Sequence, residues 1–383
     1  MFFREVTPLI ADPDTIRAAR IYPGGHNLDR VFGAKPRPEP GWHYPEAWIF
    51  SPVAAINPGS SRSDEGLTRI YDQEGVSLPW HEFVSAYGAG VTGPRPLRII
   101  VKMLDGSVTL PKEFHFRAED IERLCSYESV RTFNGNITKP EVWIRYPDAR
   151  SAAGPSYFGF RRQITPAELY DAWRAGVKEL EGLMNEVTIE PSLGLYIPGG
   201  VVHSLGPGLY FEVLADGDLK ITLQEAFAGR TLTRAEQLGL LYTGREDDVR
   251  RVLDFVDCSR YGEAVVRDAV CVPRPVGPSR HELLRNSFFE ADWVTVPAHG
   301  SHVLRNERPP RPHILVAATG VGRVTSRQAD IRIGPHGSTY EDFVTGAPCV
   351  GAIVHHETPQ AEIVNEGANP LVLLHVREPW EEA

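Results

Sequence analysis

The sequence has 383 residues, of which 42% are hydrophobic and 23% charged, and its formal net charge is -10 at pH 7. These values are ordinary for a folded chain and exclude long disordered regions, and the acidic balance gives no basic surface for nucleic acid or for a membrane. The 35 glycines and 32 prolines favour short strands and loops over long helices.

The amino-terminal segment and the cysteines favour a cytoplasmic protein. The first residues, MFFREVTPLIADPD, reach an Arg and a Glu after a few apolar residues, so they lack the apolar core of a signal peptide. Four cysteines are scattered without a CxxC pair: Cys125, Cys258, Cys271 and Cys349. We expect them to be reduced, buried thiols. We expect a small molecule as the partner, and a homodimer stays open.

Short strands are predicted from Leu97 to Ile144, where the runs LRIIVKML, KEFHF and EVWIRY are separated by polar turns. Strand patterns return further along the chain in VTIEP, LGLYIPGG and GLYFEVLADGDLKITLQE. The helix between these two groups of strands is therefore expected to be an insertion into a β-domain.

One long helix is predicted for that insertion, TPAELYDAWRAGVKELEGLM. Thr165 is the expected N-cap, and Glu168 completes a capping box with it. An apolar face is formed by residues at helical spacing: Leu169, Trp173, Val177, Leu180 and Met184.

A small helical connector is predicted from about residue 231 to 262, where a second capping box joins Thr233 and Glu236. The segment CVPRPVGPSR, residues 271 to 280, is the best linker candidate because it combines three prolines with a glycine. Beyond it, strand and turn patterns alternate again. The remaining residues therefore predict a second β-domain.

The motif KEFHF places an acidic side chain and an imidazole where they can bind a metal ion. Glu113 and His115 are two residues apart, so on a strand they project from the same face. Phe114 and Phe116 then pack on the opposite face. A Glu and a His that point into a barrel are costly to bury without a partner, and a metal ion satisfies both.

A second motif, LYIPGGVVHSLG, supplies another histidine. Pro198, Gly200 and His203 have the Pro-x-Gly-x-x-His spacing of the second cupin motif. Pro and Gly favour a tight turn between strands, and this turn is expected to direct His203 into the barrel.

Three segments resemble, in the same order, the type I mannose-6-phosphate isomerase (phosphomannose isomerase) family of the cupin superfamily. Residues 113 to 116, Glu-Phe-His-Phe, resemble the family's Gln-Val-His-Pro strand, and Lys-Pro-Glu-Val-Trp at 139 to 143 resembles its Gly-Lys-Thr-Glu-x-Trp strand. PGGVVHSLGPGLYFEVL, at 198 to 214, resembles the family's Pro-x-Gly-x-x-His turn and following strand. With the similar opening RIYPGGHNLDRVFG and EAWIFS, the resemblance covers about residues 20 to 230.

The resemblance implies a mainly β fold. It consists of a cupin-type double-stranded β-helix (jelly-roll) barrel with a helical insertion and connector, followed by a second, cupin-like β-domain. We therefore divide the chain into a metal-binding cupin catalytic domain (1–230), a helical connector and linker (231–275) and a C-terminal cupin-like β-domain without metal (276–383).

Carried over position by position, the resemblance implies one divalent metal ion held by four side chains: Glu113, His115, Glu141 and His203. Zn is the expected ion, with Mn and Fe as alternatives. Lys139 and Glu212 match residues that line the family's substrate pocket. We predict that they are catalytic, because moving a proton between two carbons requires an acid or base beside the metal.

Two departures from the family concern the substrate. Thr222 stands where the family has an Arg that contacts the substrate, and Pro111 stands where it has a Ser that helps to hold it. A phosphate requires cationic or backbone donors. Lys220, Arg161, Arg162 or Arg230 could supply them, and we take Lys220 and Arg230 as the candidate substrate-binding residues. Glu113 also adds a negative charge where the family has a neutral Gln.

The implied function is that of a metal-dependent aldose–ketose isomerase, which interconverts mannose 6-phosphate and fructose 6-phosphate through a cis-enediol. Three alternatives stay open. The first is an isomerase of a different or unphosphorylated sugar, and the second is a non-catalytic carbohydrate-binding cupin. The third is a cupin oxygenase, which would be expected to use iron and more histidine ligands.

Overall fold

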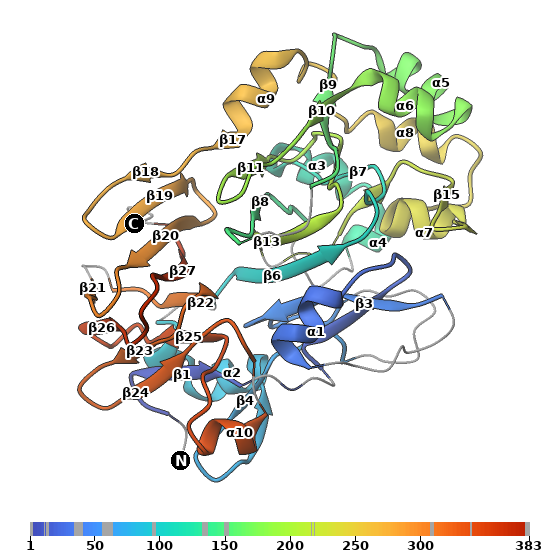
Figure 1. The fold of residues 1–383 in the computed structure, drawn as a ribbon. Helices are drawn as coiled ribbons and strands as arrows, with labels where there is room; N and C mark the ends of the chain where they lie inside the picture. Colours follow the sequence, from blue (N-terminus) through green and yellow to red (C-terminus); the bar gives the residue numbers. More distant parts are fainter. Residues whose placement is uncertain are drawn as a thin grey trace.

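The computed structural model describes residues 3–10, 12, 15–33, 41–55, 64–93, 97–131, 137–148, 153–215, 217, 219–306, 310–337 and 339–379. Antiparallel sheets dominate the fold, as the mainly β prediction requires. In Figure 1 the carboxy-terminal strands, in orange and red, lie at the lower left, and the helices α5, α6 and α8 lie at the opposite, upper end.

Two sheets form a cupin-type barrel in the first part of the chain. The larger sheet has seven strands, in the order β17 (Val270–Cys271), β11 (Gly194–Ile197), β8 (Glu141–Arg145), β13 (Gly208–Ala215), β6 (Ile99–Gly106), β3 (His43–Ile49) and β2 (Arg17–Arg20). The smaller sheet has five, in the order β10 (Met184–Val187), β9 (Ser156–Phe160), β12 (His203–Ser204), β7 (Glu113–Phe114) and β14 (Ile221–Thr222). The cupin-type fold predicted from the sequence is confirmed.

A row of polar and aromatic side chains crosses the larger sheet. Trp48 on β3 pairs with Lys102 on β6, and Lys102 pairs with Glu212 on β13. Glu212 in turn pairs with Trp143 on β8. Because successive residues of a strand point to opposite faces, the four lie on one face, and their neighbours along each strand join the hydrophobic core on the other. The charged side chains therefore lie on the inner face of this sheet, and the hydrophobic core packs against its outer face.

The predicted long helix is two helices, which corrects the sequence prediction. α5 (Pro166–Ala175) ends at Gly176, whose φ of 118° lies in the region that favours glycine, and α6 (Val177–Leu183) follows it. Four of the five predicted apolar residues are buried, but Val177 is exposed because the break turns it out of the face. The predicted capping boxes at Thr165 and Thr233 are both confirmed.

The predicted helical connector is present and extends further than expected. It contains α7 (Arg234–Leu238), the 3-10 helix η2 (Gly239–Leu241) and α8 (Asp248–Leu253). α9 (Glu263–Ala269) lies beyond the predicted limit at residue 262. Of the other described helices, α2 (Trp80–Val91) has 12 residues. The rest are shorter: α1 (His26–Phe32), the 3-10 helix η1 (Ala118–Asp120), α3 (Ile121–Leu124), α4 (Glu128–Arg131) and α10 (Tyr340–Val344).

Two further sheets form the carboxy-terminal part. One has seven strands, in the order β1 (Val6–Leu9), β25 (Gly351–Val354), β22 (His313–Thr319), β27 (Leu371–Arg377), β20 (Glu290–Val296), β19 (Arg280–Arg285) and β18 (Arg274–Pro275). The other has four, in the order β21 (Ser301–Arg305), β26 (Gln360–Asn365), β23 (Gly322–Thr325) and β24 (Asp330–Ile333). Two small hairpins complete the strands: β4 (Arg69–Tyr71) with β5 (Ser77–Pro79), and β15 (Ala226–Phe227) with β16 (Arg230–Thr231).

The first strand of the chain lies in the carboxy-terminal sheet. β1 pairs antiparallel with β25, with Val6 opposite Val354, and Figure 1 shows the blue strand beside the orange ones. One hydrophobic core also includes residues from both ends of the chain, and Phe211 contacts Trp293 with ring centroids 6.0 Å apart. The domain boundaries at residues 230 and 275 remain a prediction.

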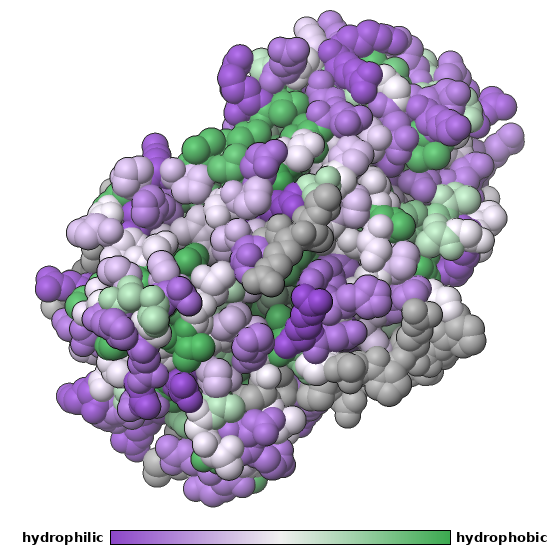
Figure 2. All heavy atoms as spheres, in the orientation of Figure 1, coloured by the Kyte–Doolittle hydropathy of each residue, from purple (hydrophilic) through white to green (hydrophobic). Residues whose placement is uncertain are grey.

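The surface and the thiols add two observations. Figure 2 shows a mostly hydrophilic face, with hydrophobic atoms gathered near α9 and β17. Among the described residues, no helix is both long enough and apolar enough to cross a membrane. All four cysteines are free, but Cys125 is exposed and Cys258 half-buried, so the expectation that all of them are buried is wrong for these two.

The contact between β1 and the carboxy-terminal sheet predicts a dependence of stability on pH. The buried His355 ring lies 2.7 Å from the Thr7 hydroxyl, and burial lowers the pKa of His355 from 6.5 to about 4. Below pH 6.5 His355 binds a proton in the unfolded chain but not in the folded chain. The free energy of unfolding therefore decreases as the pH falls from 6.5 towards 4. We expect this histidine to cost about 2 kcal/mol between pH 7 and pH 5.

Urea unfolding at both pH values checks this expectation. The free energy of unfolding of His355→Gln should fall by about 2 kcal/mol less than that of the wild type between pH 7 and pH 5. His336→Gln, at an exposed histidine of the same part of the chain, is the control and should follow the wild type. An identical loss in all three proteins would contradict the assignment.

Candidate metal centre and cavity

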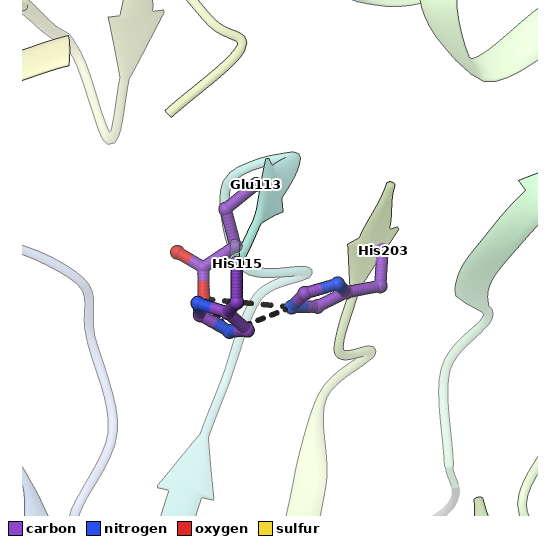
Figure 3. Close-up of side chains that lie close together, drawn as sticks. All are labelled: Glu113, His115 and His203. Carbon is purple, nitrogen blue, oxygen red and sulfur yellow. Dashed lines mark hydrogen bonds and ion pairs between the residues drawn. The ribbon is translucent and has the colours of Figure 1, made fainter. Parts of the chain in front are cut away.

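Two histidines face each other inside the barrel. His203 lies on β12, opposite Glu113 of β7, and His115 follows that strand. The Nε2 atoms of the two rings are 3.2 Å apart, and both side chains are fully buried. Figure 3 shows the two rings and the Glu113 carboxylate converging on one point.

Backbone carbonyls determine which ring nitrogen carries hydrogen. His115 Nδ1 lies 3.2 Å from the carbonyl of Leu219, and His203 Nδ1 lies 2.8 Å from the carbonyl of Val201. A carbonyl only accepts, so Nδ1 is the protonated nitrogen and Nε2 has a free lone pair. Burial and the nearby positive charge of Lys139 hold the pKa of His115 well below 6.5. The two Nε2 atoms thus face each other with their Nδ1 atoms held by carbonyls, an arrangement that a bound cation would stabilise.

Two carboxylates complete the group. Glu113 Oε1 lies 4.0 Å from His115 Nε2 and 3.9 Å from His203 Nε2. Glu141 is the first residue of β8, on the facing sheet, and its carboxylate lies 3.5 Å from each of these nitrogens. Burial raises the pKa of Glu113, but the positive charge of Lys220 and of the other neighbours lowers it by more, so this carboxyl is charged. The donors fit a divalent metal of the zinc class.

The Pro-x-Gly-x-x-His turn positions His203 against the strand that carries the other ligands. Gly200 has a φ of 82°, which favours glycine, and its N–H donates to the carbonyl of His115 at 2.6 Å. This bond ties the turn to the β7 strand, so the two histidines are held by one local unit. Glu113, His115 and His203 offer ligand atoms that all lie within 4.8 Å of one another.

Lys139 links the candidate metal centre to Glu212. Its Nζ lies 2.6 Å from Glu141 Oε2 and 3.1 Å from Glu212 Oε1. Lys102 Nζ lies 3.6 Å from the same Glu212 oxygen and 3.9 Å from the centre of the Trp48 ring. A buried ion-pair network therefore starts at a candidate ligand and continues along the inner face of the larger sheet.

The Glu212 carboxyl has a pKa above its ordinary value. Burial is the largest cause, and the negative charges of Glu141 and Glu46 act in the same direction. Lys102 and Lys139 offset these effects only in part. A buried carboxyl with a raised pKa, beside a candidate metal site, is suited to accepting and returning a proton.

The sequence analysis did not identify the part of this network that contains Arg20, Glu46 and Lys102. Glu46 Oε1 accepts from Arg20 Nε at 2.8 Å and from the Tyr22 hydroxyl, and Glu46 Oε2 accepts from Trp48 Nε1 at 2.8 Å. Burial raises the pKa of Glu46, but Arg20 and Lys102 lower it by more, so the net shift is downward. A single charge within an apolar strand, as in LRIIVKML, is the signal that could have identified Lys102 and Glu46.

The network lines a cavity of about 150 Å³ between the two sheets. The described residues in its wall come from both sheets and from the loops at their ends: Arg20, Ile21, Tyr22, Trp42, Glu46, Lys102, Leu104, Leu110, Pro111, Glu113, Lys139, Glu141, Trp143, Glu212, Lys220, Thr222, Phe227, Arg230, Leu232 and Glu236. The described part of the wall thus combines apolar surface with converging cationic and carboxylate side chains, which suits a polar ligand.

The remaining candidates from the sequence also lie at this cavity. Lys220 Nζ is 3.2 Å from Glu113 Oε2, and Arg230 forms an ion pair with Glu236. Thr222 lies opposite Glu113 in the sheet, and Pro111 is part of the wall. The structure therefore brings together all the predicted metal-ligating, catalytic and substrate-binding residues, and their roles remain predictions.

The fold is similar to that of solved phosphomannose isomerases over nearly the whole chain. A protein described as a putative mannosephosphate isomerase from Archaeoglobus fulgidus aligns with a TM-score of 0.65 and 15% identity, covering 99% of each chain. A variant of phosphomannose isomerase from Salmonella typhimurium aligns with a TM-score of 0.65 and 11% identity, covering 99% of this chain and 100% of that one.

A zinc-bound mannose 6-phosphate isomerase also aligns, with a TM-score of 0.65 and 12% identity, covering 98% of this chain and 100% of that one. No protein-family model matches the sequence, and no curated protein matches it significantly. At these identities the likeness shows that the chain has the fold of the phosphomannose isomerases.

The facing nitrogens predict tight binding of one zinc ion per chain. Because His203→Ala removes one of the two lone pairs, it should weaken zinc binding by about 100-fold or more. Competition with a chelating dye measures this affinity, and circular dichroism checks that the variant is folded. His336→Ala, at an exposed histidine, should bind zinc like the wild type. Equal affinity in wild type and His203→Ala would contradict the site.

Proposed function

We propose that this protein is a metal-dependent aldose–ketose isomerase that acts on mannose 6-phosphate or a related sugar. The observation that carries the proposal is the contact of Lys139 with both Glu141, a candidate ligand, and Glu212, a carboxyl with a raised pKa. An isomerase requires a metal centre and a proton shuttle side by side, and this arrangement supplies both.

The reaction moves a proton between C1 and C2 through a cis-enediol. A zinc-class ion, when bound, would polarise the two oxygens as a Lewis acid. In this proposal Glu212 removes the proton from one carbon and returns it to the other, and its raised pKa suits both steps. Lys139 forms ion pairs with both Glu141 and Glu212 and so holds Glu212 beside the centre. Burial of these groups strengthens their electrostatic effects on the reacting atoms.

The structural comparisons support this proposal, because the neighbours that share the fold are described as phosphomannose isomerases and one of them is zinc-bound. The non-catalytic carbohydrate-binding alternative requires a metal but no proton shuttle. A buried carboxyl with a raised pKa is costly to maintain and has no evident use in such a module. The structure is therefore more easily explained by turnover than by binding alone.

A coupled assay for fructose 6-phosphate formed from mannose 6-phosphate tests the proposal. Glu212→Gln keeps the size of the side chain but removes its basicity, so turnover should fall by about 10²- to 10⁴-fold. Zinc content should stay near that of the wild type, because Glu212 is not a candidate ligand. Glu186→Gln, at an exposed glutamate of β10, should keep full activity.

The outcomes of this assay separate the alternatives. Zinc-dependent activity that is lost in Glu212→Gln supports the isomerase. Sugar binding with no product from any of the tested aldoses, with or without phosphate, would support the binding module and refute the isomerase. Full activity of Glu212→Gln would refute the role given to that carboxyl.

A further inference from the structure

Among the described residues, five cations line the cavity wall, and they fall into two groups by exposure. The side chains of Lys102 and Lys139 are 3% and 5% exposed, and that of Arg20 is 10% exposed. Those of Lys220 and Arg230 are 40% and 44% exposed. Lys220 and Arg230 therefore lie at the mouth of the cavity. If the carbonyl of a sugar lies near the candidate metal centre, a charged group at the far end of that sugar points towards Lys220 and Arg230.

At rest, a carboxylate holds each mouth cation. Arg230 pairs with Glu236, whose carboxylate also accepts from the Thr233 N–H at 2.8 Å and from the Thr233 hydroxyl at 2.9 Å. These two bonds belong to the capping box of α7 and do not depend on Arg230. Arg230 can therefore turn towards an anion while Glu236 Oε2 keeps both of its partners.

Lys220 is held by a carboxylate of the candidate metal centre itself. Its Nζ is 3.2 Å from Glu113 Oε2, while Glu113 Oε1 faces the two imidazoles. Lys220 and a metal ion thus neutralise the same negative charge. An ion bound at Oε1 weakens the attraction between Glu113 and Lys220, and the exposed ammonium group can then move to another anion.

The charge balance of the wall agrees with such a change. Among the described residues that line the cavity, five are cationic and five are carboxylates, so the wall is formally neutral. A divalent ion adds two positive charges and leaves an excess equal to the charge of a phosphate dianion. The cavity is therefore expected to attract an anionic sugar only after the metal is bound.

We propose that metal binding at Glu113 releases Lys220, which then binds the anionic group of the substrate together with Arg230. Metal and sugar phosphate would accordingly bind with positive cooperativity through this single lysine. The inference deepens the proposed function and rests on its metal site, but it does not depend on turnover.

Calorimetric titration with a hexitol 6-phosphate tests the inference, because this probe has no carbonyl group and cannot isomerise. Zinc-loaded protein should bind it at least about tenfold more tightly than metal-free protein, and the probe should tighten zinc binding by the same factor. The unphosphorylated hexitol is the matched control and should show little of this coupling. Equal affinity of the probe for both forms of the protein would overturn the proposal.

Two variants separate the proposed role of Lys220 from direct binding of the phosphate to the ion. In Lys220→Met, the probe should bind more weakly and lose most of its dependence on zinc, while zinc binds more tightly because a competing cation is gone. In Arg230→Met, probe affinity should fall with zinc affinity unchanged. Lys178→Met, at an exposed lysine of α6 outside the cavity wall, should behave as the wild type.

Coupling that survives in Lys220→Met would overturn the proposal, since the phosphate would then be bound by the ion itself. This failure is distinct from failure of the proposed function. Zinc-dependent isomerisation without coupling would leave the proposed function standing, and coupling without isomerisation would leave the role of Lys220 standing.

Discussion

The structure of the cavity depends on one constraint, which is that charges buried between two sheets must be compensated. A buried ion pair that loses one partner costs about 3–5 kcal/mol, because the remaining charge stays out of water. Here each lysine or arginine of the wall has a carboxylate partner, and Lys139 is shared between Glu141 and Glu212. At the candidate metal centre two imidazole nitrogens lie 3.2 Å apart beside two carboxylates, a group of donors that a bound cation would satisfy.

The barrel meets this constraint through strand register. Cross-strand pairing places Lys102 beside Glu212 on the larger sheet and His203 opposite Glu113 on the smaller one. The outer face of the larger sheet packs into a hydrophobic core shared with the carboxy-terminal strands, and such close packing restricts movement of the sheet. The carboxy-terminal strands thus contribute to the site indirectly, by packing against the sheet on which the ion-pair network lies.

Local patterns were sufficient to predict much of the fold from the sequence. The alternation in KEFHF and EVWIRY, the capping boxes at Thr165 and Thr233, and the turn before His203 all depend on residues close together in the chain. The break at Gly176 was missed, because the apolar spacing continues across it and only the backbone conformation reveals it. The pairing of β1 with the last sheet was also missed, since no local pattern specifies a partner nearly 350 residues away.

The sequence by itself determined the strands, the helix caps and the candidate ligands. Each of these depends on the spacing of residues close together in the chain, and the family resemblance supports them. Only the tertiary structure decided which charges meet. Arg20, Glu46 and Lys102 join the site because three separate strands align in one sheet. The competition between Lys220 and a metal ion for Glu113 likewise depends on a contact between residues more than a hundred positions apart. Such contacts follow from sheet register and closure of the barrel, and these are properties of the whole chain.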